Sequence, residues 1–275
     1  MNIAICQLPN GLTHDSLAWE RFVRRVERAR PDVTLLNEIP FGPWAARESA
    51  FDEYLAAESI EAHTAALPAL RALPGAVISS RPVRGGDRLA NEGFLLADGK
   101  YQAVHHKQYF PQESGFFESA WFRASRVGFE TFDYRGTRFG MLLCTEIMFT
   151  EWARHYRRRG AHVIVVPRAS GTSIEVWQTA ARMAAIVSGC YVLSSNRVSP
   201  HLTDEPLFGG AGFAYSPSGE LLQETSDGLP LAVIRIDHES VRRAQRGYPC
   251  YVLELGEDLN TGTADLSCAF DTLTI

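Results

Sequence analysis

The sequence has few cysteines, and none are spaced as in a zinc site or a disulfide framework. Its five cysteines lie at positions 6, 144, 190, 250 and 268, with no CxxC pair. An odd number of dispersed cysteines is typical of a reducing compartment. No apolar run approaches the roughly 20 residues of a membrane-spanning helix, and the first residues, MNIAICQLPNG, lack the features of a secretion signal. We therefore expect a cytoplasmic protein with no membrane partner.

A surplus of positive charge is also missing. The chain has 27 Lys and Arg against 32 Asp and Glu, which gives a formal net charge of −5. A mildly acidic chain argues against nucleic acid as a partner. Charged residues make up 21% and apolar residues 45% of the 275 positions, as expected for a globular protein with a sizeable core.

Several common catalytic motifs are absent too. There is no GxSxG nucleophile elbow, and the glycine-rich stretches 93–100 and 209–215 have the wrong spacing for a phosphate loop or a dinucleotide fingerprint. The eight histidines are scattered, and His105 and His106 would point to opposite faces of one strand. We predict no metal and no cofactor.

What the sequence does contain is an alternation of amphipathic helices and apolar strands. Helices are predicted over 17–30, 58–73, 150–160 and 174–189, with Pro68 kinking or dividing the second. Buried strands are predicted over 32–38, 161–167 and 190–196, and Asp98-Gly99 and Arg135-Gly136 mark hairpin turns. Hairpins together with β-helix-β units predict an α/β fold of mixed sheets covered by helices. We expect one domain over 1–275, with about 252–275 as a C-terminal tail.

Three predicted strands end at a reactive side chain. Glu38 closes VTLLNE, Lys107 closes KYQAVHHK and Cys144 closes RFGMLLC. Functional sites of layered α/β proteins gather at strand ends and on the loops that follow them. Each residue alone has an ordinary explanation, as a core thiol or a solvated charge. Together they supply a nucleophile, a cation and a carboxylate base, which favours nucleophilic catalysis.

Five blocks, in order, make the chain resemble the nitrilase (carbon-nitrogen hydrolase) superfamily, especially its amidase and carbamoyl-amidohydrolase branches. They are TLLNEIPFGPW (34–44), HHKQYFPQESGFFESAWF (105–122), GMLLCTEIMFTEWARHYRRRGAHVIVVP (140–167), WQTAARMAAIVSGCYVLSSNRV (177–198) and FGGAGFAYSPSGELL (208–222). The resemblance implies a four-layer α-β-β-α sandwich with two mixed sheets. It also implies a homodimer or higher homo-oligomer.

The resemblance assigns roles to four residues. Cys144 would attack an amide-type carbon of a small molecule and form a thioester, with Glu38 as general acid and base. Lys107 would hold the oxyanion, and its charge would favour the thiolate. Glu118, which follows a Gly-Phe-Phe step, would orient the lysine and the substrate. The Cys-Thr-Glu step matches neither the Cys-Trp-Glu of nitrilases nor the Cys-Tyr-Asp of many amidases, so the role of Glu146 stays open.

The substrate pocket is less defined by sequence. The backbone N–H of Thr145 is expected at the oxyanion, and Arg168 could bind a substrate carboxylate. Aromatic and apolar residues near the triad are further candidates for the pocket wall, namely Trp44, Tyr109, Trp121 and Met148. Trp177 is assigned to core packing. These residues predict a hydrolase of a small amide or N-carbamoyl compound. Alternatives are nitrile hydrolysis, acyl transfer to an amine on the same triad, or a catalytically silent binding or assembly module.

Overall fold

The computed structural model describes residues 1–124, 128–201 and 206–252 of the chain. Of the predicted tail at 252–275, residue 252 is described and the others lie outside the described residues. Within the described ranges, no helix has the length and the apolar character required to cross a bilayer.

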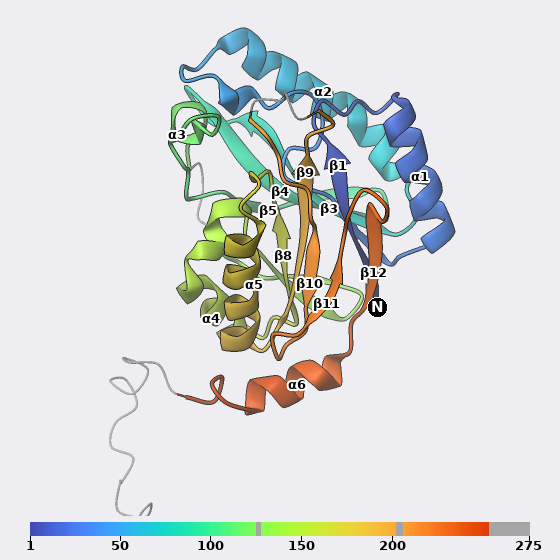
Figure 1. Cartoon of the computed structure of the whole chain (residues 1–275), viewed down its shortest axis with the longest axis vertical. Helices are drawn as coiled ribbons and strands as arrows, with labels where there is room; N and C mark the ends of the chain where they lie inside the picture. Colours follow the sequence, from blue (N-terminus) through green and yellow to red (C-terminus); the bar gives the residue numbers. More distant parts are fainter. Residues whose placement is uncertain (125–127, 202–205, 253–275) are drawn as a thin grey trace, which may run out of the picture.

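The elements alternate as expected for an α/β fold (Figure 1). The helices are α1 (Leu17–Ala29), α2 (Glu53–Arg71), α3 (Glu118–Trp121), α4 (Thr150–Arg158), α5 (Ile174–Ser188) and α6 (His238–Arg246), with 3-10 turns η1 (Ala45–Arg47) and η2 (Cys144–Met148). The strands are β1 (Asn2–Pro9), β2 (Val33–Leu35), β3 (Ala76–Arg84), β4 (Leu89–Ala97), β5 (Lys100–His106), β6 (Phe132–Tyr134), β7 (Thr137–Met141), β8 (Val163–Pro167), β9 (Tyr191–Val198), β10 (Phe213–Tyr215), β11 (Leu221–Glu224) and β12 (Leu231–Arg235).

The strands form two mixed sheets that share β1. The first half of β1 pairs antiparallel with β12 and parallel with β2, and β3, β4 and β5 continue that sheet. The last residues of β1, Gln7 to Pro9, pair parallel with β9. The second sheet runs from β9 through β8 and β7 to β6, with β10 and β11 on the other side of β9.

Three cores separate four layers. Ile3 and Ile5 of β1 lie in the core between the sheets, which also receives Met141 and Val165 from the second sheet. Because successive strand residues point to opposite faces, Ala4 joins the core under α1 and α2 instead. A third core packs the outer face of the second sheet against α4 and α5, and Figure 1 shows where these two helices lie beside β8. The predicted α-β-β-α sandwich is confirmed.

Three predicted boundaries were wrong. One is the end of β7, which stops at Met141, three residues before the predicted end at Cys144. Helix α2 begins at Glu53, five positions before the predicted start, because the Asp52 carboxylate caps the N–H groups of Tyr54 and Leu55. It runs past Pro68 to Arg71 without dividing; Pro68 is near the C-terminal end, where the proline disturbs few helical hydrogen bonds. Strand β2 covers only 33–35 of the predicted 32–38, so Glu38 lies in the loop that follows it.

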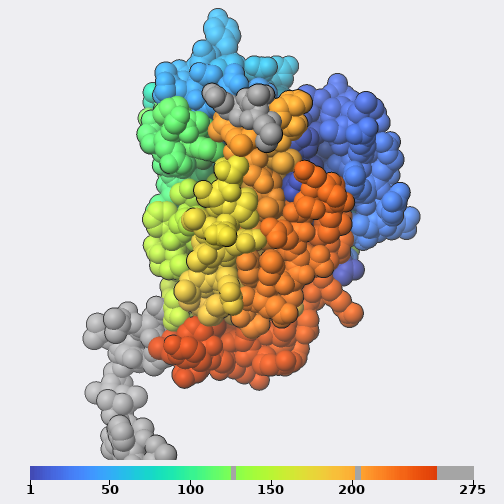
Figure 2. All heavy atoms as spheres, viewed as in Figure 1, coloured from blue at the N-terminus to red at the C-terminus, as the bar shows by residue number. Residues whose placement is uncertain are grey.

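The parallel strands point their carboxyl ends toward the same pole of the sandwich. Figure 1 shows β1, β8 and β9 running toward the end where α3 lies, away from α6. In the space-filling view (Figure 2), α6 forms the base of the opposite pole, and α5 with the β10–β11 hairpin covers the near face. The loops after β2, β5, β7 and β8 therefore meet at the α3 pole.

Candidate active site

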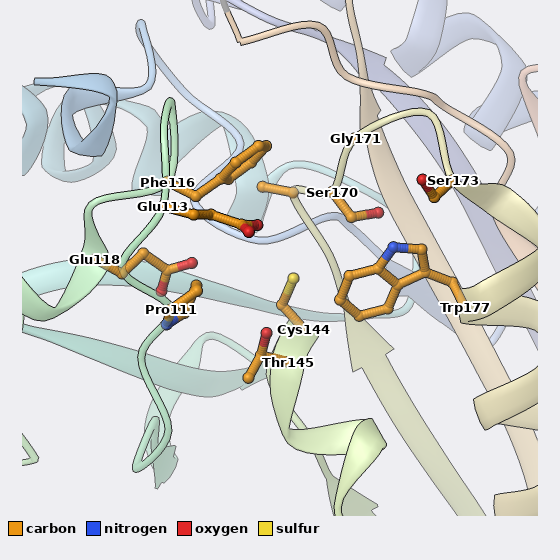
Figure 3. Close-up of a pocket in the computed structure, with 11 residues that line it drawn as sticks. Pro111, Glu113, Phe116, Glu118, Cys144, Thr145, Ser170, Gly171, Ser173 and Trp177 are labelled. Atoms are coloured by element: carbon orange, nitrogen blue, oxygen red, sulfur yellow. The ribbon is translucent and has the colours of Figure 1, made fainter.

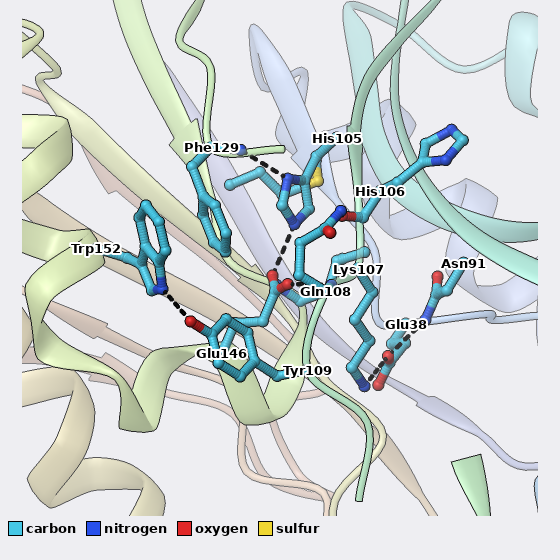
Figure 4. A network of polar contacts seen from close by, with 12 residues as sticks. Glu38, Asn91, His105, His106, Lys107, Gln108, Tyr109, Phe129, Glu146 and Trp152 are labelled. Atoms are coloured by element: carbon cyan, nitrogen blue, oxygen red, sulfur yellow. Dashed lines mark hydrogen bonds and ion pairs between the residues drawn. The ribbon is translucent and has the colours of Figure 1, made fainter. Parts of the chain in front are cut away.

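A buried ammonium group between two carboxylates lies at this pole. Lys107 directly follows β5 and is fully buried. Its Nζ donates to Glu38 Oε1 at 2.8 Å and to Glu118 Oε2 at 2.6 Å (Figure 4 shows the contact with Glu38). Glu38 follows β2 and Glu118 opens α3. Buried charges are tolerated when they are paired, so this contact joins three distant chain segments.

The neighbouring strand β4 fixes the base. Asn91 Nδ2 donates to Glu38 Oε1 at 2.7 Å, and the Asn91 carbonyl accepts from the Lys107 backbone N–H at 3.0 Å. Glu38 Oε2 and Glu118 Oε1 are buried, and neither accepts a hydrogen bond from a described residue. Each carboxylate thus uses one oxygen to bind the lysine and leaves the other as an acceptor.

Cys144 begins η2, three residues after β7 ends. Its φ of +50° places a non-glycine residue in the left-handed region, a conformation that costs free energy and occurs often at functional sites. The side chain is buried, and the charges of Glu38, Lys107 and Glu118 all act on its thiol. The backbone turn therefore holds the sulfur beside the buried charges.

Burial sets the protonation states. It raises the pKa of the Cys144 thiol, Glu38 raises it further, and Lys107 lowers it only in part. The lysine acts in the direction expected from sequence, but the net shift is upward, so the resting cysteine is a neutral thiol. Burial lowers the pKa of Lys107, yet Glu118 and Glu38 together raise it more, and it stays charged. Burial raises the pKa of Glu118 to about 8 against the opposing charge of Lys107.

A cavity of about 180 Å³ opens onto the sulfur. Figure 3 shows Cys144, Thr145 and Glu118 among its walls. The loop after β5 contributes Pro111, Glu113 and Phe116, the loop after β8 contributes Ala169, Ser170 and Gly171, and the start of α5 contributes Ser173 and Trp177. The volume suits a small molecule.

Glu146 has a different environment. Its Oε2 accepts from the Leu143 N–H and from His105 Nε2, and its Oε1 accepts from the Gln108 N–H, each at 2.7 Å. Because the Phe129 N–H donates to His105 Nδ1, the proton of a neutral His105 is on Nε2. Glu146 thus ties the cysteine turn to the segment around Lys107. These hydrogen bonds engage both of its carboxylate oxygens.

Of the predicted pocket residues, Thr145 lines the cavity and the other five are not among its described lining residues. Trp44 Nε1 donates to the Gly115 carbonyl, Trp121 Nε1 donates to the Glu48 carbonyl, and Tyr109 stacks on Phe149. Met148 is 37% exposed. Of these three aromatic side chains, Trp44 binds the turn that carries the lining residues Glu113 and Phe116.

Arg168 is buried beneath the cavity wall. Its Nε, Nη1 and Nη2 donate to Ser194 Oγ, Ser170 Oγ and the Ala211 carbonyl, and the guanidinium lies 5.4 Å from the ring centroid of Trp177. All three nitrogens therefore have protein partners. This geometry leaves little capacity for the substrate carboxylate that the sequence suggested.

The sequence analysis did not assign Asn91 or most of the lining residues of the cavity to the site. Asn91 binds Glu38, while Glu113, Ser170 and Trp177 line the cavity. Glu113 lies inside the quoted 105–122 block, so the block was the available signal. Trp177 opens the quoted 177–198 block but was assigned to core packing. Asn91 lies outside the quoted blocks, and its contact with Glu38 depends on strand register.

The chain is similar in sequence to known carbon-nitrogen hydrolases. The sequence model of the family described as Carbon-nitrogen hydrolase matches residues 2–246. The chain belongs to the carbon-nitrogen hydrolase family. Among curated members, N-carbamoylputrescine amidase of Solanum tuberosum is 25% identical over 170 residues, which cover 56% of this chain and 57% of that protein. The chain thus spans little more than half the length of this curated relative.

Solved carbon-nitrogen hydrolases share the fold. A carbon-nitrogen hydrolase from Helicobacter pylori G27 superposes with a TM-score of 0.78 at 21% identity, covering 91% of this chain and 94% of that one. An amidase from Nesterenkonia sp. superposes with a TM-score of 0.73 at 20% identity, covering 88% of this chain and 92% of that one. A mutant of the Nesterenkonia AN1 amidase, which also superposes, is described as coming from the nitrilase superfamily. The nitrilase fold implied by the resemblance is confirmed.

Proposed function

We propose that the chain hydrolyses the C–N bond of a small amide or N-carbamoyl compound, with Cys144, Lys107 and Glu38 as its catalytic triad. The observation that carries the proposal is that the Cys144 thiol lines one small cavity and experiences the charges of the buried Lys107–Glu38 ion pair. The relatives named above include an amidase and an enzyme named for an N-carbamoyl substrate, which agrees with this substrate class.

In the first half-reaction Glu38 takes the thiol proton while the sulfur attacks the substrate carbon. A neutral resting thiol requires this base at the moment of attack. Lys107 has three N–H donors and uses two on Glu38 and Glu118, so the third is left for the oxyanion with the Thr145 backbone N–H. One such donor contributes about 100-fold to 1,000-fold in rate. Glu38 then passes its proton to the departing nitrogen, which leaves as ammonia or an amine as the thioester forms.

In the second half-reaction the triad hydrolyses this thioester. Glu38 accepts a proton from water, whose oxygen attacks the thioester carbon, and it returns that proton to the Cys144 sulfur as the C–S bond breaks. Glu118 holds Lys107 in place and presents its remaining oxygen to the substrate.

Replacement of the nucleophile tests the proposal. We expect Cys144→Ala to lower ammonia release from amides and N-carbamoyl compounds by roughly 10⁴-fold or more, with an unchanged circular dichroism spectrum. Cys250→Ala, which removes a buried thiol beside the carbonyls of α5, is the matched control and should stay active. Normal turnover by Cys144→Ala would refute the assignment. A nitrile arm and a hydroxylamine arm of the same assay separate hydrolysis of amides from the nitrile and acyl-transfer alternatives.

We also propose that the chain works in the cytoplasm as a homodimer or larger homo-oligomer. The four described cysteines carry no disulfide, which agrees with a reducing compartment. Val176 and Met183 on the outer face of α5 are 57% and 48% exposed, and apolar side chains on one helix suit contact with a second copy. Light scattering at micromolar concentration would measure the mass; a monomer would contradict the proposal.

A further inference from the structure

The cavity beside Cys144 has an uneven distribution of charge. Two glutamates, Glu113 and Glu118, are among its described lining residues, and no lysine, arginine or histidine is. Glu118 has its lysine partner. Glu113 has no ion-pair partner among the described residues. Its side chain is exposed, and its carboxylate points into the cavity in Figure 3. A carboxylate without a partner beside a ligand cavity attracts a cation.

The turn that carries Glu113 is well anchored. Glu113 and Phe116 exchange backbone hydrogen bonds at 3.3 and 2.9 Å. Between them, Gly115 has a φ of +79°, and a Cβ there would lie 2.7 Å from Pro206 Cβ, so only glycine fits. Trp44 Nε1 binds the Gly115 carbonyl at 3.1 Å. The carboxylate is therefore presented by a fixed backbone.

The opposite wall cannot bind an anion well. Arg168 is a buried cation behind that wall, and each of its nitrogens already donates to a protein oxygen. It lies against Trp177, which faces the cavity in Figure 3. Its charge disfavours a second cation beside α5, so an amine would lie on the side of Glu113. There the ring of Phe116, another lining residue, could also contact an ammonium.

We propose that Glu113 is a specificity residue that selects amide or N-carbamoyl substrates whose non-reacting end carries an amine cation. The proposal rests on the function proposed above and narrows its substrate class. With the reacting carbon at Cys144, the ammonium end of the substrate binds the Glu113 carboxylate at the mouth of the cavity. A substrate with a carboxylate at that end is repelled.

Matched substrates measure this preference. The pairs are 5-aminopentanamide with 5-hydroxypentanamide, and N-(4-aminobutyl)urea with N-(4-hydroxybutyl)urea, and kcat/KM is measured by ammonia release. In each pair that the wild type hydrolyses, kcat/KM should be higher for the substrate with the amine than for the substrate with the hydroxyl. In Glu113→Gln the ratio of amine to hydroxyl should fall about tenfold, the effect of one charge-assisted contact that is partly screened by water. Glu113→Asp should keep most of the ratio.

A control variant separates local from general charge effects. Glu61→Gln removes one negative charge from the exposed face of α2, away from the cavity, and should leave the ratio unchanged. An equal fall in Glu61→Gln and Glu113→Gln, or an unchanged ratio in Glu113→Gln, would overturn the proposal while leaving hydrolysis itself intact.

A binding measurement does not depend on turnover. 1,4-Diaminobutane should bind the Cys144→Ala protein in calorimetry more tightly than 4-amino-1-butanol, and the added Glu113→Gln substitution should weaken the diamine about tenfold. If no substrate is hydrolysed but this binding pattern appears, the proposed function fails and the amine site stands. Absence of diamine binding, or binding insensitive to Glu113, would refute the amine site.

Discussion

Two buried carboxylates near Cys144 use their oxygens in opposite ways. Glu146 accepts three hydrogen bonds that engage both of its oxygens, whereas Glu38 takes two donors on Oε1 and leaves Oε2 without a described partner. Leaving a buried acceptor unpaired costs free energy. The difference teaches that a carboxylate whose oxygens all accept hydrogen bonds holds the backbone in place. A carboxylate with an oxygen that lacks a partner can take part in proton transfer. Substitutions at the two sites should therefore separate activity from stability.

The largest effect is expected at the open carboxylate. Glu38→Gln should lower kcat/KM for an amide by about a thousandfold, because a carboxamide cannot carry the proton between the thiol and the leaving nitrogen. Its free energy of unfolding, from urea denaturation, should change far less, because the carboxamide oxygen of glutamine can still accept the hydrogen bonds from Asn91 and Lys107. Activity within tenfold of the wild type would contradict the role of Glu38 as the base.

The satisfied carboxylate should show the reverse. Glu146→Ala leaves the N–H groups of Leu143 and Gln108 without their acceptor, and we expect a loss of about 2–4 kcal/mol in the free energy of unfolding. Activity per folded molecule should fall less than in Glu38→Gln. A variant with normal stability and no activity would instead place Glu146 in the chemistry.

A third test uses the raised pKa of Glu118. The folded side chain keeps its proton to about pH 8, whereas an ordinary glutamate loses it near 4.5. Between these values the folded state binds more protons, so stability should fall as pH rises, by at most about 1.4 kcal/mol per pH unit. Glu118→Gln should remove this slope, and Glu61→Gln should keep it. Parallel wild-type and Glu118→Gln curves from pH 5 to 9 would contradict the assignment.

The smallest effect is expected at the residue that supports the base. Asn91→Ala removes one hydrogen bond to Glu38, and we expect kcat/KM to fall about tenfold, with KM nearly constant because Asn91 does not line the cavity. Steady-state assays that determine kcat and KM separately are the measurement. An increase in KM alone would show that Asn91 acts on substrate binding instead.

The apolar runs that lead to the site were predictable from sequence, although β2 and β7 end three residues before Glu38 and Cys144. Glu38, Lys107 and Cys144 each close an apolar run, and that local pattern survives any detail of packing. Asn91 gave no comparable signal because it reaches Glu38 only through the register of β4 against β5. Trp177, assigned to core packing, reaches the cavity from the first turns of α5, and periodicity does not tell which face of a helix meets a loop.

In the fold, too, local features were predictable from sequence and long-range pairings were not. Hairpins at Asp98-Gly99 and Arg135-Gly136 were correct because turn chemistry is local. The start of α2 was missed although Asp52 is a typical N-cap residue. Strand β1 pairs with β9, and the paired residues are more than 180 positions apart in the sequence. A local sequence pattern cannot predict a pairing over that distance.

That pairing has a consequence for biosynthesis. Strand β1 is made first, yet its neighbours β9 and β12 begin at Tyr191 and Leu231. During translation the edges of β1 that pair with β9 and β12 therefore stay unpaired until most of the polypeptide has left the ribosome. Long-range pairing of this kind slows folding and exposes unpaired strands to aggregation. Nascent chains that stop before β9 should therefore depend on chaperones to stay unaggregated.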